Sequence, residues 1–395
     1  MLEALRKKAV VAMSGGVDSS VAAALMKERG FECVGVTMKL FATEDIGGIE
    51  ESGRCSGTAG CASRKTSSYR GCCSGTAGCA SRKTSSYRGC CSLNDVEDAR
   101  AVAFRMDMPH YVLNFSDEFK TFVIDNFIET YRKGATPNPC IECNRRIKFE
   151  KLLLRAQQID FDYIVTGHYA QIERSGGRFL LKKAADSKKD QSYVLYAMTQ
   201  EQLKRAVFPL GGLAKPEVRD IARAFGFINA AKRDSQDICF VPNGDYAEFI
   251  ESYTGVSSPK GAVIDKDGAI LGVHRGIVRY TIGQRRGLGL AFNSPRYVVA
   301  KSAENNTITL GEEKDLYVKT LVADDVNLIA TDALDRPLRV TVKTRYLQKE
   351  RRGTVEQTAP DAVRIVFDEP QRAITPGQAA VFYDGDIVVG GGTIR

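Results

Sequence analysis

Residues 10–20, with the sequence VVAMSGGVDSS, determine the fold of the N-terminal part of this chain. The apolar run at residues 10–13 is typical of a buried strand, the paired glycines predict a tight turn, and residues 21–29 continue as a helix. Glycines let the backbone approach a phosphate closely, and the unpaired N–H groups at a helix start favour anions. We therefore expect a nucleotide-phosphate site formed by Ala12, Met13, Ser14, Gly15, Gly16, Val17, Asp18 and Ser19.

ATP with Mg²⁺ is the expected ligand of this loop. Asp18 offers a carboxylate that can hold a magnesium ion between phosphates, and Ser14 and Ser19 add hydroxyl donors. The sequence GxxxxGK[ST] does not occur, so the loop is not of the Walker type, and the glycine spacing does not fit a dinucleotide fingerprint. A plain turn between a strand and a helix would need neither the serines nor the acid.

Length and composition limit the class of protein. A chain of 395 residues predicts two or three domains. No apolar run approaches the roughly 20 residues that a membrane helix needs, and the N-terminus has no signal-peptide core, so we expect a cytoplasmic protein with mostly reduced cysteines. We also expect a monomer. The net charge of +8 is compatible with a polyanionic partner, and only 3 histidines are available for acid–base or metal chemistry.

Strands and helices alternate over residues 1–205. The pattern predicts a strand at 31–40, a helix at 94–106 opened by a capping box of Asn94 and Glu97, a strand at 111–115 and a helix at 117–132. A further strand at 163–165 ends in Thr166-Gly167-His168. This alternation indicates a doubly wound parallel α/β domain, whose ligands lie at the carboxyl ends of the strands.

The pattern changes in the second half of the chain. Helices are expected at 215–225 and near 246, followed by a hairpin at 263–270 with an Asp-Gly turn. Short strands at 297–300, 307–310, 338–344, 362–367, 379–383 and 386–390 favour a small C-terminal β-barrel. We expect a catalytic domain at 1–205, a central domain at 206–285 and the barrel at 286–395.

An insert at residues 45–92 contains an exact duplication. Residues 55–72 read CSGTAGCASRKTSSYRGC, and residues 73–90 repeat all 18 positions. Each copy lacks the CxxC spacing of structural zinc sites and has no histidine, so we expect a basic surface loop near a nucleic-acid channel instead of a metal site. Seven of the 11 cysteines lie in this insert.

Cys140 and Cys143 form a CxxC pair behind two prolines. Arg145, Arg146 and Lys148 follow, and positive charge lowers the pKa of a thiol because it stabilises the thiolate. A CxxC alone leaves redox and metal use open. Cys239 lies about a hundred residues later, and Cys33, within an apolar strand, is expected to be a buried structural residue.

Seven motifs occur in the order that is found in tRNA-specific 2-thiouridylases, and the chain resembles this family over nearly its whole length outside 45–92. They are SGGVDSS (14–20), TPNPCIECNRRIKF (136–149), TGHYA (166–170), KDQSYVLY (189–196), SQDICF (235–240), YTIGQRRGLG (280–289) and TPGQAAVFY (375–383). The first motif also resembles the PP-loop of ATP pyrophosphatases, which activate a carbonyl oxygen with AMP and release pyrophosphate.

The resemblance implies a tRNA-uridine 2-sulfurtransferase that acts on the wobble uridine, position 34. Met38 and Gly167 match positions that line the adenosine. Cys239 matches the cysteine that carries sulfur as a persulfide from a donor protein, and Cys143 matches its catalytic partner, so that turnover leaves a Cys143–Cys239 disulfide for a reductant to reopen. Residues that match tRNA contacts are Asn138, Pro139, Cys140, His168, Lys189, Asp190, Gln191, Arg345, Tyr346 and Gln378.

The residues alone add two phosphate contacts and leave alternatives. Arg285 and Arg286, in the Gly-rich GQRRG segment, are expected to contact tRNA phosphates. Some relatives have aspartate where this chain has Cys140, so Cys140, Cys143 and Cys239 could instead ligate a [4Fe-4S] cluster. Two other functions compete with thiolation. A PP-loop synthetase that transfers ammonia would not need paired cysteines, and a non-enzymatic RNA-binding module would not need an intact PP-loop.

Overall fold

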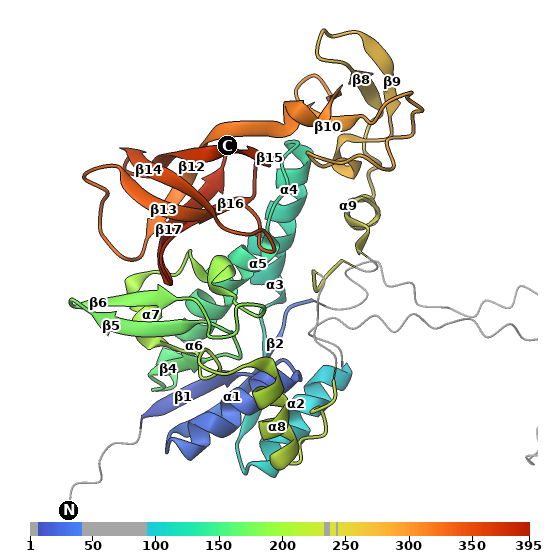
Figure 1. Cartoon of the computed structure of the whole chain (residues 1–395). Coiled ribbons are helices and arrows are strands. Elements are labelled where there is room, and N and C mark those ends of the chain that lie inside the picture. Colours follow the sequence, from blue (N-terminus) through green and yellow to red (C-terminus); the bar gives the residue numbers. More distant parts are fainter. Residues whose placement is uncertain (1–6, 42–92, 233–237, 242–243) are drawn as a thin grey trace, which may run out of the picture.

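The computed structural model describes residues 7–41, 93–232, 238–241 and 244–395 (Figure 1). The duplicated insert with its seven cysteines lies outside the described residues. The same is true of Ser235, Gln236 and Asp237, the first three residues of the motif that contains Cys239. Among the described residues, no helix is both long and apolar enough to cross a bilayer.

The N-terminal domain is built on a five-stranded parallel sheet, which confirms the doubly wound prediction. Alternate residues of its central strand face opposite sides: Val10 and Ala12 pack into one hydrophobic cluster, and Ala9 and Val11 pack into another. Both faces are therefore buried. The strand order is β3 (His110–Asn114), β2 (Glu32–Lys39), β1 (Lys8–Ala12), β4 (Tyr163–Val165) and β7 (Ala206–Val207).

Helices cover both faces of this sheet. On one side, α1 (Val17–Glu28) packs against both α2 (Leu93–Arg105) and α8 (Lys215–Ala224). Helix α2 begins at Leu93, so Asn94 lies inside the helix and the predicted capping position is wrong. Asn94 and Glu97 carry the capping-box spacing, but that spacing alone does not fix where the first helical turn starts.

The other face is covered by two long helical stretches. Segments α3 (Ser116–Phe119), η2 (Lys120–Asp125) and α4 (Asn126–Arg132) run on without a break, which confirms the helix expected at 117–132. The next stretch begins after Pro137 with α5 (Pro139–Glu142), the π-helical segment η3 (Cys143–Lys151) and α6 (Leu152–Gln158). We call residues 139–151 the cysteine helix, because Cys140 and Cys143 lie at its start.

A hairpin of the N-terminal half joins the C-terminal sheet. Strands β5 (Gln171–Ser175) and β6 (Arg178–Lys182) pair with each other, and Lys182 pairs with Ile387 at the edge of the barrel. The sequence pattern contained no signal for this pairing. Three short elements follow: η4 (Ser192–Leu195), α7 (Gln200–Arg205), which starts with a capping box at Thr199, and later α9 (Tyr246–Thr254).

The central sheet has four strands and contains the predicted Asp-Gly hairpin. The strand order is β10 (Tyr297–Ser302), β11 (Thr307–Gly311), β8 (Gly261–Ile264) and β9 (Ile270–His274), so β11 joins the hairpin through β8 and β10 pairs with β11. The short η6 (Ile277–Arg279) lies between β9 and β10 in sequence. The strands at 297–311 therefore pair with the central sheet and not with the barrel. The domain boundaries at 205 and 285 stay predictions.

Six C-terminal strands close into the predicted barrel. The antiparallel order is β12-β15-β14-β13-β16-β17, and β12 also pairs with β17, which closes the sheet. After η7 (Glu313–Leu316), the strands are β12 (Tyr317–Leu328), β13 (Leu338–Lys343), β14 (Arg351–Ala359), β15 (Ala362–Arg372), β16 (Ala379–Asp384) and β17 (Ile387–Ile394). In Figure 1, α4 rises from the parallel sheet toward the region between the barrel and the central sheet.

Candidate active site

The PP-loop forms a compact turn between β1 and α1. Gly15 has φ +68°, and a Cβ at this position would lie 2.2 Å from the carbonyl oxygen of Asp95, so only glycine fits. The backbone N–H of Ser14 donates to Ser19 Oγ (3.2 Å), which in turn donates to the Gly16 carbonyl (3.0 Å). No side chain of the described residues caps α1 at Gly16, so its first N–H groups face the loop.

Asp18 is held by two residues that the sequence analysis did not identify. Lys215 Nζ donates to both Asp18 carboxylate oxygens (2.7 and 2.8 Å), and the Tyr169 hydroxyl donates to Asp18 Oδ1 (2.8 Å). Lys215 is only 8% exposed. Lysine is rarely buried unless it is paired, and Asp18 is its partner here. The one sequence signal was its position directly before a proline at the start of a helix.

A second pair of missed residues supports the loop from the segment that precedes Cys239. Asn229 Nδ2 donates to the Gly15 carbonyl (3.0 Å) and to Ser20 Oγ (2.9 Å). Lys232 Nζ donates to the same carbonyl (3.0 Å) and pairs with Asp95 and Asp98 at the start of α2 (2.6 Å each). These contacts fix the loop from two elements that are distant in sequence.

The carboxyl end of β4 approaches the same loop, as the sequence analysis expected. A Cβ at Gly167 would lie 2.7 Å from the Asp18 carbonyl carbon, so the missing side chain permits this close contact. Met38, at the end of β2, packs against the core on the neighbouring strand. Burial keeps the pKa of His168 well below its ordinary value, and its Nδ1 lies 2.7 Å from Thr166 Oγ1, so this ring is neutral and buried.

These residues fit the phosphates of ATP. The glycine turn, the exposed Ser14 and the uncapped start of a 12-residue helix form a cradle for an anion. Asp18 provides a carboxylate for a magnesium ion, whose arrival would compete with its bond to Lys215. Gly167 adjoins this cradle, and Met38 lies at the end of the neighbouring strand β2.

The cysteine helix places Cys140 at the surface and Cys143 half-buried. Two of the expected cations beside this pair are engaged with carboxylates: Arg145 pairs with Asp325, and Arg146 pairs with Glu150. Burial raises the pKa of Glu142, between the two cysteines, while Arg145 opposes this effect.

Cys239 lies beside the helical stretch formed by α3, η2 and α4. Its neighbour Phe240 packs edge-on against Phe119 and Phe127, with ring centroids 5.6 and 5.2 Å apart. The cysteine helix contacts the same stretch through α5 and η3. Cys143, Cys239 and Met38 thus all pack against one continuous hydrophobic cluster, which also contains Ala12.

The described residues contain no group of three His, Cys, Asp or Glu side chains that is placed to hold a metal ion. Cys140, Cys143 and Cys239, which the iron–sulfur alternative would use as ligands, therefore do not form a three-ligand group in the described structure.

Several residues expected to contact tRNA make intramolecular contacts in this structure. Asp190 is buried and accepts hydrogen bonds from the N–H groups of Ala184 (3.1 Å) and Ser192 (3.2 Å). Gln191 Oε1 accepts from the Tyr169 N–H (2.9 Å). Lys189 is half-buried and follows Asp186 in the same loop.

The remaining expected contacts come from three parts of the chain: the loop before the cysteine helix and its first residue, the GQRRG segment, and the barrel. Arg345 donates to Thr375 Oγ1 (2.6 Å) and to the Ala373 carbonyl (3.0 Å), and Gln378 donates to the loop before Asn138. The rings of Tyr346 and Tyr193 have centroids 6.0 Å apart. Burial raises the pKa of Tyr346, and the charges of Asp190 and Cys140 add to the shift, so Tyr346 lies near the cysteine helix. Pro139 is buried, Asn138 is half-buried, and Arg285 and Arg286 are exposed.

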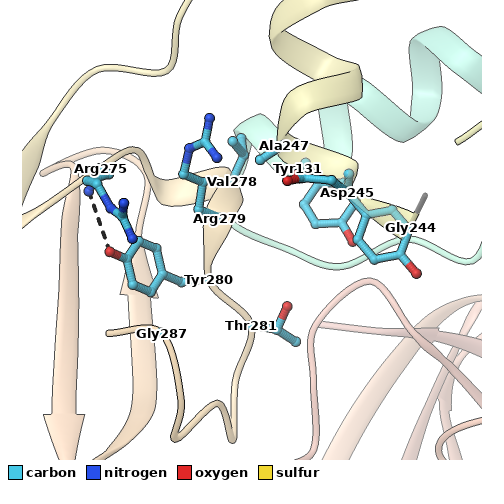
Figure 2. A pocket seen from close by; sticks show the side chains of 11 residues that line it. Tyr131, Gly244, Asp245, Ala247, Arg275, Val278, Arg279, Tyr280, Thr281 and Gly287 are labelled. Atoms are coloured by element: carbon cyan, nitrogen blue, oxygen red, sulfur yellow. Dashed lines mark hydrogen bonds between the residues drawn. The ribbon is translucent and has the colours of Figure 1, made fainter. Parts of the chain in front are cut away.

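A cavity of about 370 Å³ opens where α4, α9 and the central sheet meet (Figure 2). Tyr131 and Tyr246 line it with ring centroids 6.0 Å apart and nearly parallel rings. Arg275 and Arg279 line the other side, and Arg279 pairs with Glu251. Cationic and aromatic side chains together are typical of surfaces that contact nucleic acid.

Comparison with known proteins assigns the family. A family model described as tRNA methyl transferase HUP domain matches residues 7–69 and 76–243. A model described as tRNA methyl transferase PRC-barrel domain matches 247–312, and one described as aminomethyltransferase beta-barrel domain matches 318–394. The chain is 47% identical to tRNA-specific 2-thiouridylase MnmA of Clostridioides difficile over 99% of both chains. The chain belongs to the tRNA-specific 2-thiouridylase family.

The resemblance drawn from the seven motifs is thereby confirmed. The MnmA protein of Acetivibrio thermocellus is 47% identical over 99% of both chains. Among solved structures, a complex of 4-thiouridine synthetase with RNA and bound ATP is 14% identical with a TM-score of 0.33, and an NMN synthetase of Francisella tularensis is 11% identical with a TM-score of 0.32. These two matches cover 63% and 64% of this chain, and 50% and 79% of the respective structures.

Proposed function

We propose that this chain catalyses ATP-dependent 2-thiolation of the wobble uridine, position 34, of tRNA. The observation that carries the proposal is the placement of the PP-loop strand, Cys143 and Cys239 around one hydrophobic cluster in a member of the 2-thiouridylase family. A half-site for ATP and a half-site for sulfur therefore share one framework. Family membership supports tRNA as the substrate, and Arg285 and Arg286 are exposed and available for its phosphates.

The first half-reaction makes the uracil oxygen a leaving group. The C2 oxygen of uracil attacks the α-phosphorus of ATP, an O–P bond forms, and the bond to pyrophosphate breaks. Ser14, Ser19 and the N–H groups at the start of α1 bind the phosphates, and Asp18 would hold Mg²⁺, which neutralises charge on the departing pyrophosphate. The target uridine must leave the anticodon stack to reach this site.

The second half-reaction replaces the adenylated oxygen with sulfur. A donor protein first converts the Cys239 thiol to a persulfide. The outer sulfur attacks C2 and AMP leaves; the Cys143 thiolate then attacks the inner sulfur, so the S–S bond breaks and sulfur stays on C2. In the other route, the Cys143 thiolate attacks the inner sulfur of the persulfide first and releases hydrosulfide, which attacks C2 and displaces AMP. Both routes end in a Cys143–Cys239 disulfide that an external thiol must reduce.

The decisive experiment combines the purified chain with ATP, Mg²⁺, a persulfide donor and unmodified tRNA. We expect 2-thiouridine, AMP and pyrophosphate in equal amounts, and no 2-thiouridine with Cys239→Ser or Cys143→Ser. Cys33→Ser is the matched control, because burial raises the pKa of Cys33 to about 11 and it lies in β2 as a packed residue. Full activity of Cys239→Ser would contradict the mechanism.

The same preparation tests the iron–sulfur alternative. Purified without oxygen, the active enzyme is expected to contain no iron and to show no charge-transfer absorbance. Stoichiometric iron that is lost together with activity in Cys140→Ser would replace the persulfide mechanism with cluster chemistry.

A further inference from the structure

The barrel contacts the loop that leads into the cysteine helix. The Thr136 N–H donates to the Pro376 carbonyl (2.8 Å), and Gln378 Nε2 donates to the carbonyls of Thr136 (2.9 Å) and Pro137 (3.1 Å). A Cβ at Gly377, where φ is +86°, would lie 2.9 Å from the Thr136 nitrogen. The two backbones therefore touch, and one side chain of the barrel satisfies two carbonyls directly before Asn138.

The barrel also contacts the cysteine helix beyond Cys143. Arg145 pairs through two nitrogens with both carboxylate oxygens of Asp325, and this bond raises the pKa of Arg145. Asp325 has φ +48° and lies where the pairing of β12 with β17 shifts register, which is a bulge in the strand. Bulges of this kind are often retained where a strand must aim a side chain.

The barrel turn that carries Gln378, residues 375–378, is held by hydrogen bonds of its own. Arg345 donates to Thr375 Oγ1 (2.6 Å), and the Ile394 N–H donates to the Gln378 carbonyl (2.8 Å). Gln378 is thus a fixed donor and not a mobile surface side chain. Its Nε2 would have to leave the two carbonyls before it could donate to a tRNA base.

We propose that the C-terminal barrel forms part of the thiolation site, with Gln378 and Asp325 as positioning residues that hold Cys143 from both sides. This inference rests on the proposed function, in which Cys143 attacks a sulfur atom. Attack at a disulfide sulfur requires close alignment, and small misplacement of a reacting group reduces rate strongly. Gln378 therefore acts through the cysteine helix, in contrast to the tRNA contact that the family resemblance implies for it.

The test compares Gln378→Glu and Asp325→Asn with Asp368→Asn. A glutamate keeps the shape of Gln378 but cannot donate to two carbonyls when ionised. Asp368 is a matched control, because it forms a two-nitrogen pair with Arg339 (2.8 and 2.7 Å) on the same barrel and has no part in the proposed site. Asp325→Glu tests rescue by a longer carboxylate.

Four quantities are measured for each variant: tRNA affinity, pyrophosphate release, single-turnover thiolation, and the pH profile of Cys143 alkylation by iodoacetamide, followed by mass spectrometry in a Cys140→Ser background. We expect tRNA affinity and pyrophosphate release within twofold of wild type. Thiolation should fall at least tenfold and the alkylation rate should change at least threefold, with Asp325→Glu recovering part of both and Asp368→Asn unchanged.

Two results would overturn the inference. Weaker tRNA binding by Gln378→Glu with unchanged Cys143 alkylation would make Gln378 a tRNA contact, and unchanged alkylation in both barrel variants would remove the barrel from the site. The alkylation measurement needs no turnover, so it tests the barrel even if the wild-type chain fails to thiolate tRNA. That failure would overturn the proposed function alone.

Discussion

Asp18 shows how a single charge in the loop is balanced. Its carboxylate is the expected magnesium ligand, yet Lys215 and Tyr169 both donate to it in this structure. The side chain of Lys215 is 10% exposed and that of Asp18 is 30% exposed, so the pair is largely shielded from solvent. Removing one member of such a pair leaves an uncompensated charge.

Lys215→Met should therefore weaken ATP binding at least tenfold and lower the free energy of unfolding by about 2 kcal/mol. The phosphates would meet a carboxylate without its counter-charge. Isothermal titration with ATP and urea denaturation measure the two effects. The double variant Lys215→Met with Asp18→Asn should regain stability but not ATP affinity, and equal stability of the single and double variants would contradict this account.

At the scale of an element, strand β10 contains an unusual lysine. Burial lowers the pKa of Lys301 to about 8, and its ammonium donates to the Tyr280 carbonyl (2.7 Å). The pKa of this lysine is about 10.5 in the unfolded chain. Between pH 8 and 10.5 the unfolded state binds more protons, so the contribution of Lys301 to stability rises with pH in this window.

Lys301→Met should remove this dependence. At pH 7.5 the variant is expected to be more stable than wild type by on the order of 1 kcal/mol, because the cost of burying the ammonium exceeds the lost hydrogen bond. The difference should shrink at pH 9.5. Urea unfolding at both pH values measures it, with Lys266→Met, an exposed lysine of the same sheet region, as control. A constant difference at the two pH values would show that Lys301 is charged throughout.

At the scale of the whole molecule, we expect the exposed Arg285 and Arg286 to contribute to the affinity for tRNA. Arg285→Ala combined with Arg286→Ala should weaken binding of all tRNAs to a similar degree and make the salt dependence of log K less steep, by about 0.7–0.9 for each phosphate that is no longer neutralised. Filter binding at several salt concentrations measures the slope. Weaker binding of one tRNA alone would instead indicate base recognition.

The duplicated segment offers a second test at this scale. Deleting residues 73–90 removes one complete copy and is expected to leave thiolation turnover within about twofold of wild type. The matched control replaces the same copy by a Gly/Ser sequence of equal length. A loss of turnover in the deletion but not in the replacement would make length, and not sequence, the property that matters.

The sequence by itself determined the parts of this protein that depend on local pattern. The SGGVDSS loop predicted the phosphate cradle because glycine freedom and a helix start are encoded within seven residues. Alternating elements predicted the parallel sheet, and the short strands predicted the barrel. The order of seven motifs identified the family, because each is itself a local string.

Only the tertiary structure decided which distant groups meet. Lys215 and Lys232 act on the loop from about 200 residues away, and no local pattern distinguishes a buried, paired lysine from a solvated one. Strand pairing assigned β10 and β11 to the central sheet, because hairpin spacing does not specify a partner sheet. Likewise, Gln378 reaches the loop before the cysteine helix, and Asp325 reaches the helix itself, only because the barrel docks against this region. Such docking depends on the shapes of both surfaces.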